Sequence, residues 1–123
     1  MHRALPRIVE SDLTVRQVAG HVEARLRRGR MEPESRIDLH GYSYEGAYRS
    51  LVSFLMRAHA EGKRLVLVIT GKGGVLRPHL PAWLNGAELQ QLVIGIREAH
   101  PKHGGGGAFY VALQKNKPGW RHP

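Results

Sequence analysis

Residues 65–74 read LVLVITGKGG, and this stretch indicates the class of fold. Its first half, 65–69, is continuously apolar and rich in β-branched residues, which is typical of a strand buried on both faces. A glycine-rich turn, 70–74, follows it, and the apolar residues of 76–84 predict a short helix whose regularity Pro81 limits. A strand that passes through a glycine turn into a helix predicts an α/β fold.

The sequence upstream of this stretch adds a second strand and helix. Residues 36–40, RIDLH, predict a short strand that ends at Gly41. Ser43 predicts the N-cap of a helix, and Gly62 predicts its end. The apolar face of this helix comprises Ala47, Leu51, Phe54, Leu55 and Ala58.

Two more strands are predicted downstream, at 92–96 and at 109–113, and four glycines lead into the second of them. The order is therefore β-α-β-α-β-β. The two helical connections predict parallel first strands joined by right-handed crossovers, whereas the last two strands have no helix between them and predict an antiparallel edge. The fold class is α/β, or by a stricter naming an α+β two-layer sandwich with a mixed sheet.

A basic helical segment is predicted ahead of the first strand. Thr14 predicts its N-cap, and apolar residues recur at helical spacing at Val15, Val18, Val22 and Leu26. The segment ends in a cluster of arginines, Arg25, Arg27, Arg28 and Arg30. This cluster either contacts nucleic-acid phosphates or is a solvated helix end. We predict three parts: a basic helical extension at 1–35, the main domain at 36–115 and a loose tail at 116–123.

Composition narrows the classes of function. The 123 residues include 19 Lys and Arg against 10 Asp and Glu, a net charge of +9 with histidine neutral. This excess favours nucleic acid as the partner, with a solvated basic surface as the alternative. The absence of cysteine excludes disulfides, zinc–thiolate sites and thiol nucleophiles, and it suits a reducing cytoplasm. No apolar run reaches the ~18 residues that cross a bilayer, so we expect a cytoplasmic protein without a membrane partner.

Asp38 and His40 are the first candidate site residues. They lie two apart in the predicted strand, so both side chains leave the same face, at the carboxyl end where ligands of α/β sheets gather. A carboxylate beside an imidazole can orient it for acid–base chemistry. Alternatively, Asp38 holds a divalent metal such as Mg²⁺, or it caps backbone amides of the turn.

The glycine-rich turn is the second candidate. Its expected phosphate contacts are Thr70, Gly71, Lys72, Gly73 and Gly74, with Arg77 nearby. Glycines allow backbone amides to approach an anion closely, although the spacing is not that of a Walker loop and a plain tight turn is the alternative. If the first two strands are parallel neighbours, this turn and the Asp38 turn emerge at the same sheet edge and converge.

Further nucleic-acid contacts are expected from Lys102 and His103, in a loop beside the four glycines, which is either a lid over the substrate or a solvated connection. Tyr42 either stacks on a base or covers the core. We expect Trp83 in the core, and His21, His59 and His79 at the surface or in packing. No spacing of His, Asp and Glu predicts a zinc site.

Three motifs occur in order: IDLHG at 37–41, TGKG at 70–73 and PKHGGGGAFYV at 101–111. Together they resemble the Smr (small MutS-related) domain family. The resemblance implies a fold similar to the C-terminal domain of translation initiation factor three, and nucleic-acid binding, with nicking or cleavage of DNA or RNA in several members. It also implies that the family's functional positions are Asp38 and His40 together with 71–73.

The leading hypothesis is an endonuclease in which His40 is the general base or acid, Asp38 orients it and the glycine turn holds the scissile phosphate. With RNA, a 2′-hydroxyl attacks and no metal is required; with DNA, water attacks and Mg²⁺ held partly by Asp38 becomes attractive. The alternative is a non-catalytic module that binds nucleic acid or the ribosome. An enzyme for a small phosphorylated metabolite is disfavoured by the basic charge.

Overall fold

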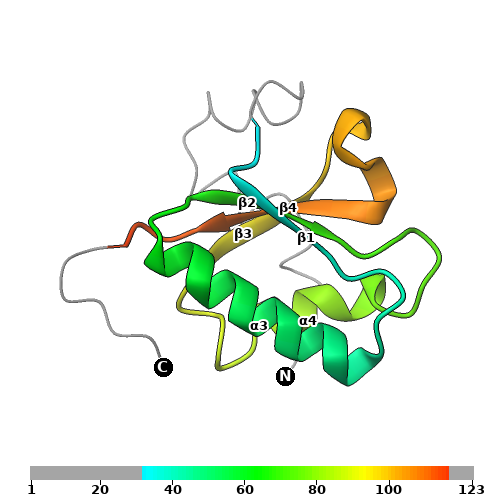
Figure 1. Cartoon of the computed structure of the whole chain (residues 1–123), viewed down its shortest axis with the longest axis horizontal. Helices are drawn as coiled ribbons and strands as arrows, with labels where there is room; N and C mark the ends of the chain where they lie inside the picture. Colours follow the sequence, from blue (N-terminus) through cyan, green and yellow to red (C-terminus); the bar gives the residue numbers. More distant parts are fainter. Residues whose placement is uncertain (1–31, 117–123) are drawn as a thin grey trace.

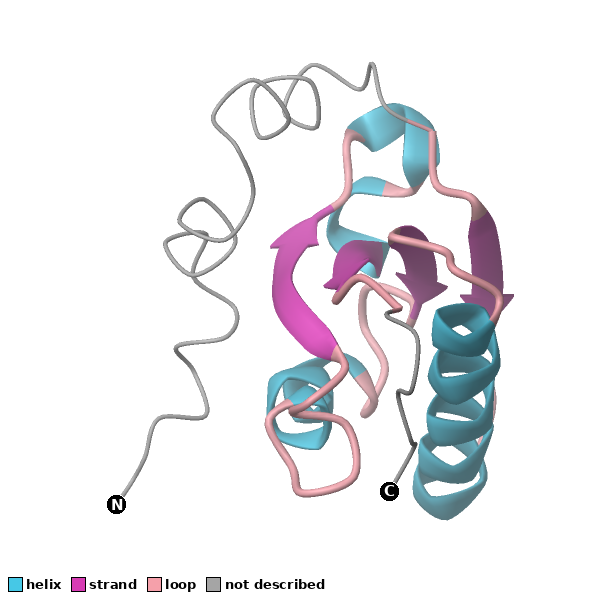
Figure 2. Ribbon diagram, turned by 90° about the vertical axis from the view of Figure 1, so that its left-hand side faces the viewer, coloured by secondary structure: helices cyan, strands magenta, loops and turns pink. Residues whose placement is uncertain are grey.

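The computed structural model describes residues 32–116, which form a sheet with two α-helices on one face (Figures 1 and 2). The strands are β1 (Ser35–Asp38), β2 (Leu65–Ile69), β3 (Val93–Glu98) and β4 (Ala108–Leu113). The helices are α3 (Tyr44–Ala60) and α4 (Leu80–Leu84), and short 3-10 helices cover Arg77–His79, Pro101–His103 and Gly105–Gly107. The predicted α/β, two-layer class is confirmed.

The strand order in the sheet is β1-β2-β4-β3. β1 and β2 are parallel neighbours, as predicted, and β4 runs antiparallel to both β2 and β3. The predicted antiparallel edge is therefore the β4–β3 pair. β4 is an interior strand, and all six of its residues are buried. The sequence did not indicate this interior position.

The boundaries of three predicted elements differ in the structure. β1 ends at Asp38, so His40 lies in the turn that follows and not in the strand. The turn closes early because the Tyr42 amide donates to the Leu39 carbonyl at 3.0 Å. The third strand is shifted toward Glu98.

The helix expected at 76–84 is split into a 3-10 turn and α4. Each part has a proline within its first two positions, Pro78 and Pro81, and proline has no N–H with which to continue a single hydrogen-bonded ladder.

α3 begins and ends where the sequence predicts. The Ser43 hydroxyl accepts a hydrogen bond from the Gly46 amide at 3.1 Å, and Glu45 lies in the first turn, where its charge complements the helix dipole. Gly62, at φ +83°, follows the helix. The predicted apolar face is the buried face of α3.

The sheet is apolar on both faces, because alternate residues of the central strands contribute to two clusters. Val66 and Val68 of β2 join the cluster beneath α3 and α4, whereas Leu65 and Leu67 join a cluster on the other face with Tyr110 of β4. This arrangement explains why 65–69 carries no polar position. Within residues 32–116, no helix is long and apolar enough to span a membrane.

Candidate active site

All four strands begin or end at the same edge of the sheet. Asp38 pairs with Ile69, Ile69 with Ala108, and Phe109 with Glu98, so β1, β2 and β3 end there and β4 begins there. Figure 1 shows the turns that leave this edge on its right-hand side. We call this edge the Asp38 rim, and its turns comprise residues 38–42, 70–77 and 98–107.

Asp38 and His40 form a hydrogen-bonded pair at this rim. Asp38 Oδ1 accepts from His40 Nδ1 at 2.6 Å and from the His40 backbone amide at 3.1 Å. The side chains are 49% and 69% exposed. The hydrogen bond from His40 holds the pKa of Asp38 below its usual value. Because a carboxylate on Nδ1 places the imidazole proton there, Nε2 of His40 is left as an accessible proton acceptor.

The Asp38 turn and the glycine turn meet, as the sequence predicts. A Cβ added at Gly71 would lie 3.5 Å from the His40 Cβ. Gly71 also has φ +84°, a conformation that side-chain-bearing residues rarely adopt. The imidazole is therefore next to the start of the 70–74 turn.

Some of the predicted phosphate-binding groups have partners within the fold. The amides of Thr70 and Gly71 both donate to the Gly107 carbonyl, at 2.9 and 3.0 Å. The Thr70 hydroxyl is buried and donates to the Gly71 carbonyl at 3.0 Å. Both residues therefore already have acceptors inside the fold, and their contact with phosphate stays a prediction. Within residues 32–116, the amides of Lys72, Gly73 and Gly74 have no hydrogen-bond acceptor, and these three residues are exposed.

Gly107 packs directly against the glycine turn. A Cβ at this position would lie 3.3 Å from the Gly71 carbonyl carbon and 3.3 Å from the Lys72 amide nitrogen, so only glycine fits without displacement. The sequence analysis described this segment as a lid or a solvated loop and missed this contact. The signal available was the glycine run directly before a buried strand, where a backbone can approach another closely.

Arg77 connects the glycine turn to the other end of the rim. Its Nε donates to the Gly106 carbonyl at 2.7 Å, and its guanidinium lies 3.6 Å from the carboxylate of Glu98 and 5.1 Å from the centre of the Phe109 ring. Arg77 therefore braces the rim through contacts within the protein, and its role as a phosphate contact stays a prediction. Glu98 was not singled out from the sequence.

The pattern of an exposed Asp-x-His pair beside a glycine turn agrees with the comparisons to known proteins. The family model of the Smr domain matches residues 37–114. The chain belongs to the Smr domain family.

Relatives of this Smr domain carry two kinds of name. The Escherichia coli (strain K12) protein named probable DNA endonuclease SmrA is 34% identical over 98 residues, 74% of this chain and 51% of that protein. The Shewanella putrefaciens protein named ribosome rescue factor SmrB is 32% identical over 90 residues, 72% of this chain and 49% of that protein. The chain thus spans about half the length of these curated relatives.

Two solved structures share the fold of this Smr domain. YdaL, a stand-alone small MutS-related protein from Escherichia coli, gives a TM-score of 0.64 at 34% identity and covers 80% of this chain and 78% of its own. The Smr domain of Thermus thermophilus MutS2 gives a TM-score of 0.58 at 29% identity and covers 65% of this chain and 98% of its own.

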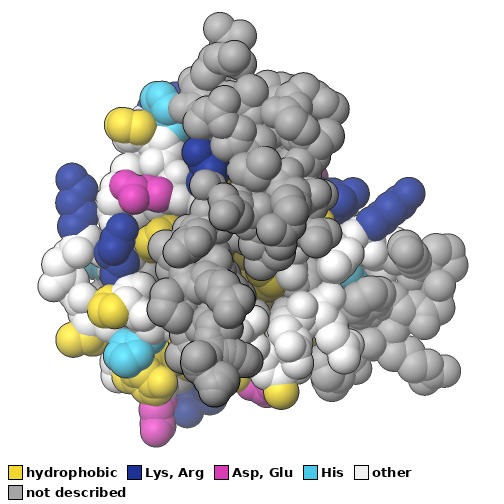
Figure 3. Space-filling view, turned by 180° about the vertical axis from the view of Figure 1, so that it is seen from behind, with side chains coloured by type: hydrophobic (Ala, Val, Ile, Leu, Met, Phe, Trp, Pro, Cys, Tyr) yellow, Lys and Arg dark blue, Asp and Glu magenta, His cyan; other side chains and the backbone are white. Residues whose placement is uncertain are grey.

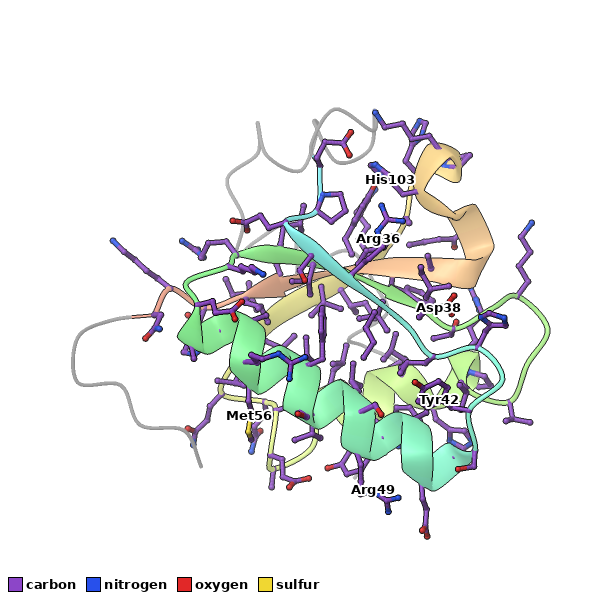
Figure 4. All side chains as sticks on the ribbon, in the orientation of Figure 1. Arg36, Asp38, Tyr42, Arg49, Met56 and His103 are labelled. Carbon is purple, nitrogen blue, oxygen red and sulfur yellow. The ribbon has the colours of Figure 1, made fainter. Side chains whose placement is uncertain are left out.

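The His103 side chain in this Smr domain is not an open contact. It is 7% exposed, and Nδ1 lies 2.6 Å from the Tyr110 hydroxyl while Nε2 lies 3.1 Å from Glu32. The hydrogen bond from His103 lowers the pKa of Glu32, and burial raises the pKa of Tyr110. Figure 4 shows His103 on the side of the sheet away from α3. Lys102 remains exposed and pairs with Glu32 at 3.3 Å.

The remaining expected residues fall in three groups. Tyr42 is exposed in the turn after β1 and so does not cover the core. Trp83 is buried in the core as predicted, and His59 is buried in α3. Outside the described residues lie His21 and the arginine cluster, Arg25, Arg27, Arg28 and Arg30.

Figure 3 shows Lys and Arg side chains along its left-hand edge, which is the Asp38 rim side of the molecule seen from behind.

In the described part of the chain, no group of three or more His, Cys, Asp or Glu side chains could hold a metal ion. Oδ1 of Asp38 is engaged by His40, so Asp38 offers Mg²⁺ one free carboxylate oxygen. Magnesium is often held by one or two carboxylates with waters and substrate phosphates. That Asp38 holds the ion stays a prediction.

Proposed function

We propose that this chain is an endonuclease that cuts phosphodiester bonds of a nucleic-acid strand lying across the Asp38 rim. The observation that carries the proposal is the exposed His40, bound to Asp38 through Nδ1 and adjacent to the glycine turn at Gly71. A nucleophile needs a base to remove its proton and donors to stabilise charge on the phosphate, and the rim supplies both side by side.

His40 moves the proton. Its Nε2 takes the proton of the attacking hydroxyl, whose oxygen forms a bond to phosphorus. Asp38 stays ionised, since the His40 hydrogen bond lowers its pKa, and it stabilises the imidazolium that forms. The bond from phosphorus to the leaving oxygen then breaks, and that oxygen leaves with a proton supplied by the imidazolium or by water.

The glycine turn holds the phosphate. The exposed amides of Gly73 and Gly74 have no acceptor within residues 32–116, and Lys72, whose backbone packs against Gly107, adds a cation to the turn. Donors of this kind stabilise the charge that grows on the non-bridging oxygens in the transition state. Thr70, Gly71 and Arg77 support the turn from inside through their contacts with 106–107.

The substrate class is readable from the product. If the attacking group is a 2′-hydroxyl, the strand is RNA and the products are a 2′,3′-cyclic phosphate and a 5′-hydroxyl. If the strand is DNA, which has no 2′-hydroxyl, water is the attacking group and a phosphate monoester remains. The name of one relative, probable DNA endonuclease SmrA of Escherichia coli, supports an enzyme of this kind.

The test is incubation of the purified chain with matched end-labelled RNA and DNA single strands, with and without a chelator, followed by identification of the new ends. Asp38→Asn and Glu61→Gln make a matched pair, because both remove one exposed carboxylate and Glu61 is at the far end of α3, beside Lys63. Cleavage that falls in Asp38→Asn alone supports the proposal. Equal cleavage by both variants rejects the assigned pair.

A second candidate function is a binding module that acts on the ribosome without cutting. It is favoured by the relatives named ribosome rescue factors and by the net charge of +9. In that case the same preparation binds RNA tightly, with affinity that falls steeply as salt rises, and yields no new strand ends.

A further inference from the structure

A pocket lies between α3 and α4, outside the Asp38 rim, and nothing in the proposed cleavage uses it. Its volume is about 400 Å³, and its walls include Tyr44, Glu45, Tyr48 and Arg49 of α3 and Trp83 of α4. Pockets for small ligands range from about 300 to 1,000 Å³ and are mostly apolar with a few polar groups. The size suits one flat aromatic group rather than a large cofactor.

The aromatic walls are held in place. The Tyr44 ring meets Trp83 at 5.1 Å and 68° and His79 at 4.8 Å and 89°, and its hydroxyl accepts a hydrogen bond from Trp83 Nε1 at 3.2 Å. The Tyr44 side chain is nonetheless 47% exposed. A ring that is fixed on two sides and open on the rest loses little conformational entropy when a planar group stacks on it.

Hydrogen-bonding groups flank these rings. The Tyr48 hydroxyl donates to Glu88, and this bond raises the pKa of Tyr48 to about 12, so the phenol stays neutral and fixed. The side chains of Glu45 and Arg49 make no hydrogen bond or ion pair within residues 32–116. Figure 4 shows Arg49 projecting from α3 on the side away from the sheet. A carboxylate accepts from exocyclic amines of bases, and a guanidinium donates to their carbonyl and ring-nitrogen acceptors.

The pocket is within reach of the reaction site. Tyr44 follows His40 by four residues, so their Cα atoms are no more than ~14 Å apart. A stacked strand advances by about 3.4 Å per nucleotide, so a base in the pocket lies within roughly four nucleotides of the phosphate at His40. Figure 4 shows Asp38 and Tyr42 at the end of the molecule where α3 begins, and Tyr42 is exposed between the two sites.

We propose that the pocket between α3 and α4 binds one unpaired nucleobase of the strand that is cut at the Asp38 rim. This inference rests on the proposed function for the identity of the strand. A base inside a duplex is stacked and paired, so it enters such a pocket only after it is flipped out. The pocket therefore makes the chain prefer single strands or unpaired loops over duplexes.

Binding is measured apart from cleavage. Trp83 and Trp120 are the two tryptophans of the chain, so Trp120→Phe leaves Trp83 as the fluorescent reporter in the pocket. His40→Ala is added so that no strand is cut. The probes are a 12-nucleotide single-stranded RNA, the same strand with its bases removed at four central positions, and the same sequence as a duplex. We expect the intact single strand to quench Trp83 and to bind about tenfold more tightly than the other two.

Point variants locate the base. Tyr44→Ala should weaken binding of the intact strand about tenfold and leave the affinity for the abasic strand unchanged, whereas Tyr44→Phe, which keeps the ring, should bind as the parent does. Arg49→Ala has a matched control in Arg57→Ala, an exposed arginine near the other end of α3. Only Arg49→Ala should weaken binding of the intact strand. Unfolding curves verify that each variant is folded.

The inference is overturned if the abasic and intact strands bind equally, or if Tyr44→Ala and Arg49→Ala both bind the intact strand as tightly as Arg57→Ala does. A protein side chain would then be the remaining occupant of the pocket. Failure of the proposed function has a separate signature: the parent chain cuts no strand, while base-dependent quenching of Trp83 persists in the His40→Ala protein.

Discussion

His40 and His103 follow two strands that end at the same rim, β1 and β3, yet their surroundings differ in every respect. His40 is exposed, donates from Nδ1 to Asp38 and presents Nε2 to solvent. His103 is buried. The Glu32 carboxylate can only accept, so Nε2 of His103 donates to it and Nδ1 accepts from the Tyr110 hydroxyl, which itself accepts from the His100 amide.

The two histidines thus hold opposite tautomers, because in each ring the nitrogen that faces a carboxylate carries the proton. A carboxylate partner leaves a basic nitrogen free for chemistry, whereas a hydroxyl partner together with a carboxylate on the far nitrogen uses up both nitrogens. At the end of β1 the histidine is therefore available for acid–base chemistry, whereas after β3 the histidine stabilises the fold. The assignment depends on neighbours and not on residue type.

The largest effect that this comparison predicts is on cleavage by His40→Ala. Loss of a general base lowers the rate of the chemical step about 10²- to 10⁴-fold. Because the side chain is exposed, the free energy of unfolding should change only by the ~0.2–1 kcal/mol of its pair with Asp38. Single-turnover cleavage and urea unfolding of the parent and the variant measure both quantities. A variant that cuts at the parental rate removes His40 from the mechanism.

Next in size is the effect of Gly107→Ala, which tests the contact between the two rim segments. The added Cβ lies 3.3 Å from the backbone of Gly71 and Lys72, so the glycine turn must shift. The shift needed is a few tenths of an ångström, so the rate should fall by less than the ~10²-fold that follows a displacement of about 1 Å. Gly106→Ala is the matched control, because its Cβ meets only a Glu98 oxygen at 3.5 Å. Equal rates for the two variants would show that the turn tolerates the shift.

His103→Ala should reverse the pattern seen at His40. Removing the ring leaves the proton of the Tyr110 hydroxyl without an acceptor, although the His100 amide still donates to its oxygen, and this loss costs about 1–3 kcal/mol of the free energy of unfolding. The rate of cleavage per folded molecule should stay within a few-fold of the parent, since the ring contacts no reacting group. Urea unfolding and cleavage below the unfolding transition separate the two effects. A large loss of rate with unchanged stability would contradict the structural role.

The smallest effect concerns pH and the Asp38–His40 pair. The folded pKa of Asp38 is lowered from 3.8, so the pair stabilises the fold above that value, and the contribution is lost as pH falls through the lowered pKa. Because the carboxylate is half exposed, the contribution is only about 0.2–1 kcal/mol. Urea unfolding of the parent and Asp38→Asn should therefore differ slightly at pH 6, and the difference should shrink as pH falls below 3.8. A difference that grows toward low pH has the wrong sign.

Local pattern was sufficient for the strands and α3, and for the meeting of the two turns. The apolar run at 65–69 and the cap at Ser43 are local signals, and the convergence of Asp38 with Gly71 follows from parallel neighbours. These features depend on residues close in sequence or on a general rule of α/β sheets.

What the sequence could not indicate are contacts made across long separations. β4 is placed between β2 and β3, which brings the Gly107 carbonyl to the amides of Thr70 and Gly71, 36 or 37 residues away in the sequence. That contact gives the amides of two predicted phosphate-binding residues an acceptor inside the fold. The burial of His103 likewise depends on Tyr110 reaching the loop from inside the sheet.

The most direct test of the account is chemical rescue of the His40→Ala variant. If His40 serves as the proton acceptor at the glycine turn, added imidazole should restore part of the lost cleavage, in proportion to the concentration of neutral imidazole and at the same positions in the strand. The 1,3-dimethylimidazolium cation, which has no free ring nitrogen, should restore none of the lost cleavage. The account would be contradicted if the variant, without any imidazole, cleaved the strand as fast as the parent does.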